Sequence, residues 1–161
     1  MLGNALVFVS ILVAMILSIV QLPISLPPEI GYARPDWVAM VLIYWIIASP
    51  HRFGFFTAWI VGIGMDILEG GLIGQHALIY LIVTYISASL YQRLRMFSVL
   101  QQAAVILVIL ALSLMVDFWI ESITGQSEWS LWLMLPAVTG ALLWPWVFIL
   151  LRHLGRRYVE I

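Results

Sequence analysis

The stretch HALIYLIVTYISASLY (His76–Tyr91), followed by QRLR (Gln92–Arg95), sets the pattern of the whole chain. It is a long apolar run that stops at two arginines. A helix that crosses a membrane needs roughly 20 predominantly apolar residues, and Lys or Arg near its end stays on the cytoplasmic side. We therefore expect a transmembrane helix here that ends at the cytoplasmic face.

Further apolar runs lie on both sides of this one, and we expect each to form a helix. They are Gly3–Leu22, Trp37–Ser49, Phe53–Leu68, Phe97–Ile120 and Leu131–Leu151. The two short runs within residues 37–68 are separated only by the tight turn Pro50-His51-Arg52. They either both cross a locally thin membrane or form a re-entrant hairpin. Both alternatives leave the orientation of the later helices unchanged.

The charged residues alternate between the gaps that separate these runs. Six of the seven basic residues fall in the second, fourth and last gaps, whereas seven of the eight acidic residues lie at or near the other gaps. The basic set is Arg52, Arg93, Arg95, Arg152, Arg156 and Arg157, and the acidic set is Glu29, Asp36, Asp66, Glu69, Asp117, Glu121 and Glu128. Orientation follows the basic residues. The pattern predicts an all-α integral membrane protein with six transmembrane helices and both termini in the cytoplasm.

Composition supports a single polytopic membrane domain over residues 1–161. The chain is 64% apolar and only 9% charged, whereas ordinary soluble domains are about a quarter charged. It has no cysteine, which excludes disulfides, a thiol nucleophile and thiolate metal ligands. The first run lacks the basic start of a signal peptide, so we expect an uncleaved helix. Nucleic-acid binding is not expected, because so few basic residues are exposed.

Asp66 lies inside an apolar run. Counted from Arg52, a rise of ~1.5 Å per residue places it about 21 Å into a hydrocarbon core of about 30 Å. An ionisable group at that depth is costly unless it is paired, protonated or hydrated. Asp66 therefore either has a functional role or is paired structurally with Arg34, Gln75 or His76. The sequence leaves both alternatives open.

Other polar residues lie near the predicted outer ends of the helices around Asp66. They are Arg34, Asp36, Glu69, Gln75, His76, Asp117 and Glu121. We expect these groups to form an outward-facing polar patch or shallow cavity. The candidates for partner contact or for a structural polar cluster are Arg34, Asp36, Asp66, Gln75 and His76. The alternative is that residues such as Glu121 are simply solvated loop ends.

Small residues follow a spacing of four in the same run as Asp66. Gly54, Ala58 and Gly62 share one face of the predicted helix and lead to Asp66. Small side chains let two helix backbones approach closely inside a membrane. We therefore predict that these three residues pack one helix of the chain against another.

Enzyme motifs are missing or incomplete, and we expect no catalytic residue, metal or cofactor. The sequence has no His-Glu-x-x-His, no Gly-x-Ser-x-Gly and no lysine for a phosphate-binding loop. The stretch Gly62–Asp66 is similar to the Gly-x-Gly-Asp signature of intramembrane aspartyl proteases, with Asp117 as its second carboxylate. Met65 interrupts that signature, and Asp117 is predicted nearer the surface.

Several motifs together resemble the rod-shape-determining protein MreD family. They are Arg34-Pro35-Asp36-Trp37, Tyr44-Trp45, Pro50-His51-Arg52, Ala58-Trp59, Gly62, Asp66 and Gly74-Gln75-His76-Ala77-Leu78. The resemblance implies a membrane component of the bacterial cell-elongation machinery. It also implies the partners MreC, MreB and the glycosyltransferase and transpeptidase of lateral-wall peptidoglycan synthesis. The implied fold is similar to the S-components of vitamin transporters, and no catalytic residue is carried over.

The resulting hypothesis is a non-catalytic, multi-pass scaffold in the bacterial inner membrane that docks partner proteins, and contacts membrane lipid, within the bilayer. Two alternatives belong to other classes. One is a small-molecule-binding or transport subunit that uses the outward polar cavity. The other is an intramembrane aspartyl hydrolase that uses Asp66 and Asp117.

Overall fold

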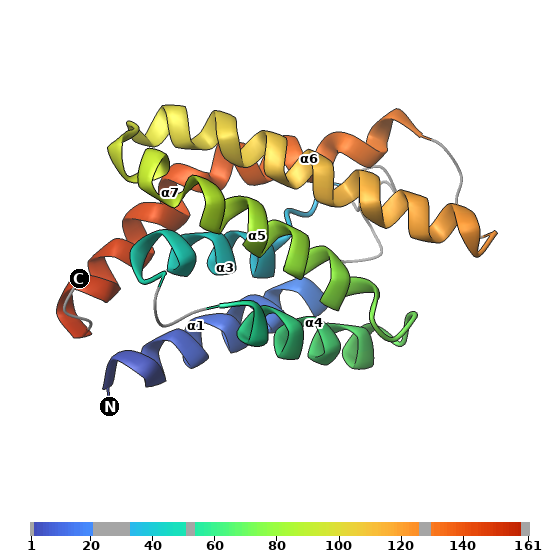
Figure 1. The fold of residues 1–161 in the computed structure, drawn as a ribbon, viewed down its shortest axis with the longest axis horizontal. Helices are drawn as coiled ribbons and strands as arrows, with labels where there is room; N and C mark the ends of the chain where they lie inside the picture. The colour runs from blue at the N-terminus through green and yellow to red at the C-terminus, as the bar shows by residue number, and fades with distance from the viewer. Residues whose placement is uncertain (1, 21–32, 51–53, 126–129, 159–161) are drawn as a thin grey trace.

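The computed structural model describes residues 2–20, 33–50, 54–125 and 130–158, and its regular structure within these ranges is entirely helical. The helices are α1 (Leu2–Ile19), α3 (Trp37–Ala48), α4 (Phe55–Glu69), α5 (Gln75–Met96), α6 (Val99–Ile123), the short 3₁₀ helix η1 (Leu131–Met134) and α7 (Leu135–Tyr158) (Figure 1). The all-α prediction is confirmed for this part of the chain. Glu29, Arg52 and Glu128, which contributed to the charge pattern, lie outside the described residues.

The helices run in alternating directions. Helices α1, α4 and α6 point one way, and α3, α5 and α7 point the other way, so that the start of α1 and the end of α7 lie at the same end of the molecule (Figure 1). We call this end the arginine end, after Arg93, Arg95, Arg152 and Arg156. The opposite end is the acidic end, after Asp36, Asp66, Glu69, Asp117 and Glu121. The alternation along the sequence becomes a separation of charge in space.

Three segments are long and apolar enough to cross a membrane: Gln75–Met96, Val99–Ile123 and Trp132–Arg156. Two further apolar helices, Ala5–Ile19 and Trp37–Ala48, are shorter. The structure therefore supports a membrane protein. It bears out six α-helices in the described part of the chain without showing that all six cross.

Helix α3 is the centre of the bundle. Its residues from Val38 to Ile47 are all buried, and α1, α5 and α7 pack against it. At ~1.5 Å per residue, its 12 residues extend about 18 Å, well short of a hydrocarbon core of about 30 Å. A short helix that is apolar on every side is typical of a protein core. The apolar run that starts at Trp37 is therefore short because it forms a helix that is buried inside the protein.

At the arginine end, the C-terminus of α5 and the N-terminus of α6 lie at other residues than the hydropathy pattern predicted. Helix α5 was expected to stop at Tyr91 but continues to Met96, because Gln, Leu and Arg are good helix formers and Arg near a helix C-terminus is favoured by the dipole. Helix α6 begins with a capping box in which Ser98 accepts from the Gln101 backbone N–H and donates its own N–H to the Gln101 side chain. The connection between α5 and α6 is therefore only two residues long, Phe97 and Ser98.

Candidate functional site at the acidic end

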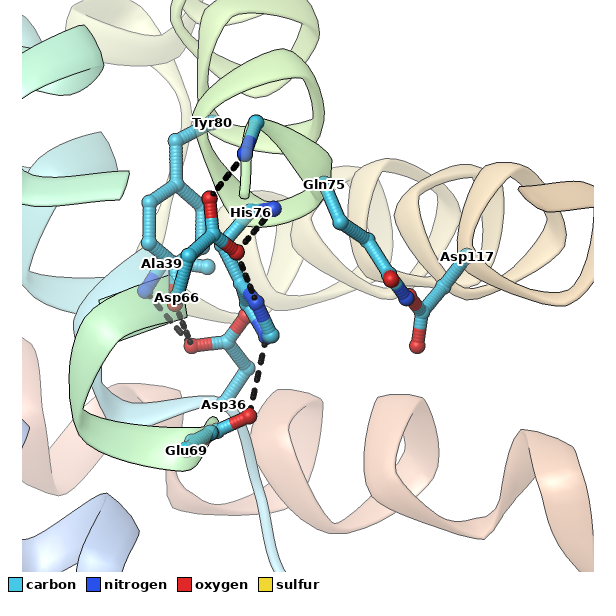
Figure 2. A network of polar contacts seen from close by, with 9 residues as sticks. Asp36, Ala39, Asp66, Glu69, Gln75, His76, Tyr80 and Asp117 are labelled. Atoms are coloured by element: carbon cyan, nitrogen blue, oxygen red, sulfur yellow. Dashed lines mark hydrogen bonds and ion pairs between the residues drawn. The ribbon is translucent and has the colours of Figure 1, made fainter. Parts of the chain in front are cut away.

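Asp66 is the most deeply buried carboxylate of the acidic end, with a relative exposure of 1%. Its Oδ2 accepts a hydrogen bond of 2.7 Å from the Gly74 backbone N–H. Its Oδ1 accepts one of 2.9 Å from the His76 backbone N–H and lies 2.9 Å from His76 Nδ1 (Figure 2). Of its three expected partners, His76 is the one that pairs with it. Arg34 and Gln75 do not.

These bonds make Asp66 the N-terminal cap of a neighbouring helix. Helix α5 begins after Gly74, which has no side chain to cap it, and the first N–H groups of a helix have no partner within that helix. Asp66 reaches across from α4 and accepts two such N–H groups. Its negative charge also faces the positive end of the α5 dipole. The carboxylate is therefore stabilised where an isolated charge would be costly.

Gly62 explains how α5 comes close enough to reach Asp66. A Cβ atom on Gly62 would lie 2.3 Å from Ala77 Cα, so only glycine allows this approach of α4 to α5. Gly62 precedes Asp66 by four residues and shares its helix face. Ala58, one turn earlier, is buried. Gly54 makes no such approach, since it is the N-cap residue of α4 and a Cβ there would meet open space.

His76 joins two carboxylates. Its Nδ1 faces Asp66, and its Nε2 lies 3.4 Å from Oε2 of Glu69, which is one turn further along α4 (Figure 2). A neutral imidazole carries one N–H and can donate to only one of them, whereas a doubly protonated ring donates to both. The position of His76 thus ties the end of α4 to the start of α5 through side chains as well as backbone.

A second aspartate, Asp36, caps the central helix. Its Oδ1 accepts a 2.9 Å bond from the Ala39 backbone N–H at the start of α3 and a 3.3 Å bond from the Tyr80 hydroxyl on α5. Burial raises the pKa of the Asp36 carboxyl, although the Ala39 bond and the nearby His76 act in the opposite direction. Tyr80 also packs edge-on against the His76 ring, with 5.8 Å between the ring centres. The two capped helices are therefore linked.

The remaining members of the predicted cluster are Gln75 and Arg34, and Arg34 lines a small cavity. Gln75 donates from Nε2 to Oδ1 of Asp117 on α6. Arg34 lines a cavity of about 200 Å³ together with Asp36, Glu69, His76 and Asp117. Among the described residues, Arg34 forms no ion pair. The structure thus places Arg34, Asp36, Asp66, Gln75 and His76 in one region.

This arrangement suits helix capping better than acid–base chemistry. Asp66 and Asp117 bond to different partners, and Figure 2 shows their carboxyl groups apart. A shared proton between paired carboxylates, as in aspartyl hydrolysis, requires the two groups to meet. Within the described ranges no group of three or more His, Asp or Glu side chains is arranged to hold a metal ion.

Sequence reasoning missed two participants. Tyr80 was not singled out, although its spacing of four from His76 places both on one helix face. Gly74 was noted as part of a motif but was given no role in capping a helix. Its φ of 102° is in the left-handed region, which favours glycine and turns its N–H toward Asp66. A glycine directly before a helix with no capping side chain was the available signal.

The fold and the site define an all-helical protein with helices long enough to cross a membrane and a bonded polar cluster at one end. The family model for the rod shape-determining protein MreD matches residues 1–154. A relative described as "Rod shape-determining protein MreD", from Haemophilus influenzae, is 29% identical over 133 residues, which are 81% of this chain and 82% of the relative. The chain belongs to the MreD family, as its motifs indicated. No solved structure matches it.

Proposed function

We propose that this chain is a non-catalytic membrane scaffold of the bacterial cell-elongation machinery, which carries out lateral-wall peptidoglycan synthesis. The proposed partners are MreC, MreB, the elongation glycosyltransferase and transpeptidase, and membrane lipid. The scaffold is a multi-pass protein of the inner membrane with six transmembrane helices and cytoplasmic termini. Its arrangement is expected to be similar to that of the S-components.

The observation that carries this proposal is the contrast between the polar cluster and the rest of the surface. The carboxylates Asp36 and Asp66 bond to helix N-termini, so they serve the fold. The outward faces of the helices present large apolar side chains such as Phe56 and Trp146, which are 72% and 75% exposed. Membership of a rod shape-determining family supports the same proposal. Recognition of partners is then expected within the bilayer.

The surface between α1 and α7 fits a partner's transmembrane helix best. An apolar cavity of about 220 Å³ lies there, and the small residues Ser10 and Ala14 contribute to its lining. Because lipid competes for apolar surface, selectivity inside a membrane comes from close packing against small residues and from interhelical hydrogen bonds. Val13 and Leu150 lie on opposite walls of this groove.

Photocrosslinking in cells tests the docking role. A photoreactive amino acid is placed at Val13 or at Leu150, which are 49% and 61% exposed, and at Val108 on α6, which is 56% exposed and does not line the groove. We expect elongation proteins to be captured from the two groove positions and not from Val108. Capture of lipid alone at all three positions would contradict the scaffold.

A small-molecule-binding or transport subunit is the second candidate function. The polar cavity lined by Arg34 and His76 favours it, but the volume of about 200 Å³ is below the ~300–1,000 Å³ of typical ligand pockets. Mass spectrometry of the gently purified protein tests this alternative. A stoichiometric small molecule that disappears in Arg34→Gln would support the transport subunit over the scaffold.

A further inference from the structure

A larger cavity, of about 650 Å³, opens at the arginine end. It lies between the last turn of α3, the connection of α5 to α6 and the second half of α7. Three arginines, Arg95, Arg152 and Arg156, contribute to its lining, and Phe97 and Phe148 contribute apolar surface. This cavity is at the opposite end of the bundle from the carboxylate cluster.

The charge around this cavity is one-sided. No carboxylate of the described chain lines it. Arg95 is held in place, because its Nε donates to the Ile47 carbonyl at 2.7 Å and its Nη2 donates to the Ala48 carbonyl at 2.8 Å. The Arg152 guanidinium lies 5.8 Å from the centre of the Phe148 ring. A guanidinium has five N–H donors, so Arg95 keeps donors beyond the two bonds described.

The hydroxyl of Tyr44 is available to a polar ligand in the same place. Tyr44 is only 2% exposed and lines the cavity, yet its hydroxyl makes no hydrogen bond to any residue in the described ranges. Arg152 and Arg156 are near enough to act on this hydroxyl electrostatically. Ser98, the N-cap residue of α6, and Val99, its first residue, also line the cavity and bring the positive end of a helix dipole to it.

We propose that this cavity binds the phosphate group of an anionic membrane lipid, with Arg95, Arg152, Arg156 and the Tyr44 hydroxyl as its donors. Guanidinium groups match phosphate oxygens in pairs of parallel hydrogen bonds. Anionic lipid head groups bind in basic pockets between transmembrane helices on the cytoplasmic side.

The lipid is favoured over free phosphate by the shape and position of the cavity. Phe97, Val99 and Phe148 give it an apolar wall that suits the glycerol and the upper acyl chain of a lipid. It also lies at the ends of the two apolar segments Gln75–Met96 and Val99–Ile123. The proposal rests on the chain being in a membrane and is independent of the scaffold role.

The experiment uses the full chain, purified in detergent and stripped of lipid. The melting temperature is followed while mixed micelles of phosphatidylglycerol, mixed micelles of phosphatidylcholine or inorganic phosphate are added, and native mass spectrometry counts the retained lipids. The variants are Arg152→Gln and Tyr44→Phe. Arg93→Gln is the matched control, because Arg93 is an exposed arginine of the same end that does not line the cavity.

We expect phosphatidylglycerol to raise the melting temperature saturably, and phosphatidylcholine and inorganic phosphate to raise it much less. Loss of one charged donor weakens such a site by about tenfold or more, so Arg152→Gln is expected to bind at least that much more weakly. Tyr44→Phe is expected to weaken binding by a smaller factor, and Arg93→Gln to bind like the original chain.

Equal effects of Arg93→Gln and Arg152→Gln would overturn the site, because a diffuse surface charge would then explain the binding. Equal stabilisation by phosphatidylcholine would overturn the preference for an anionic lipid. Equal stabilisation by inorganic phosphate would overturn the lipid as the occupant and leave a site for free phosphate. If Tyr44→Phe does not fold, Arg156→Gln replaces it, with the same expected loss as Arg152→Gln.

Discussion

The two ends of the bundle use their charged residues in opposite ways. At the acidic end, Asp36 and Asp66 cap helices, and His76 bridges carboxylates of the same helix (Figure 2). At the arginine end, Arg152 and Arg156 line an open cavity and have no carboxylate facing them within the described residues. Charges that hold helices together are unavailable for a ligand, whereas unpaired charges around a cavity can bind one. The carboxylates Asp36 and Asp66 therefore serve the fold, whereas Arg152 and Arg156 are the charges that our proposal assigns to ligand binding.

The largest expected effect comes from Asp66→Ala. This change leaves the Gly74 and His76 N–H groups without acceptors in a buried place, and it removes the partner of the His76 ring. Losses of this kind cost about 3 kcal/mol or more of unfolding free energy. Unfolding of the purified protein in detergent measures this loss of free energy, with Glu121→Gln as a control at the same end. Similar melting temperatures for both variants would contradict a folding role for Asp66.

Gly62→Ala is expected to have the next largest effect. The added methyl group would lie 2.3 Å from Ala77 Cα, so α4 and α5 must separate and the capping bonds of Asp66 must lengthen. Overpacking of this kind costs about 2 kcal/mol. Gly71→Ala is the matched control, because its methyl group meets open space. The contact between the two helices would not depend on glycine if both variants melted alike.

Arg95→Ala tests the arginine end in the same assay. The two hydrogen bonds from Arg95 to the Ile47 and Ala48 carbonyls satisfy the end of α3. Their loss is expected to cost about 1.5 kcal/mol, less than the loss of Asp66, since this end is more exposed to solvent. Arg93→Ala, which removes an exposed arginine of the same helix, is expected to change the melting temperature little. A larger loss for Arg95→Ala than for Asp66→Ala would reverse the comparison.

Asp36→Asn is expected to have the smallest effect and an unusual sign. Because burial raises the folded-state pKa of Asp36, its stabilising contribution is full below the ordinary value of 3.8 and is lost as the pH rises through the raised pKa. Asparagine keeps the acceptor for Ala39 and carries no charge, so this variant should match or exceed the original stability near neutral pH.

Melting temperatures on both sides of that pH window check this expectation. Asp36→Ala serves as the contrast, because it removes the cap and is expected to cost about 1 kcal/mol at the lower pH and less near neutral pH, where the contribution of Asp36 is lost. Lower stability of Asp36→Asn than of the original chain at neutral pH would show that the charge of Asp36 stabilises the fold.

The sequence predicted the helices well, because apolar runs and their breaks depend on local composition. The run from Trp37 and the run from Leu131 begin where α3 and η1 begin. Composition could not show that α3 is the buried centre, since a short apolar run also fits a thin crossing or a re-entrant hairpin, the two alternatives that the sequence left open. It also could not place the end of α5, where arginines interrupt the hydropathy and continue the helix.

The candidate site was predicted in part. The depth of Asp66 showed that it needs a partner, and His76 was one of three alternatives. Whether Asp66 pairs with His76 or with Arg34 depends on where the N-terminus of α5 lies. The close approach of α4 to α5 at Gly62 sets that position. The cavity at the arginine end was not predicted, because its lining comes from four helices and its existence depends on how those helices pack.

The central claim is that the acidic end and the arginine end face opposite sides of the membrane. The chain has no cysteine, so single cysteines can be introduced directly and labelled with a membrane-impermeant maleimide on intact spheroplasts. Gly71→Cys reports on the acidic end, and Met96→Cys, at a position that is 78% exposed, reports on the arginine end. We predict that Gly71→Cys is labelled from outside and that Met96→Cys is labelled only after permeabilisation. Labelling of both from the same side would contradict the account.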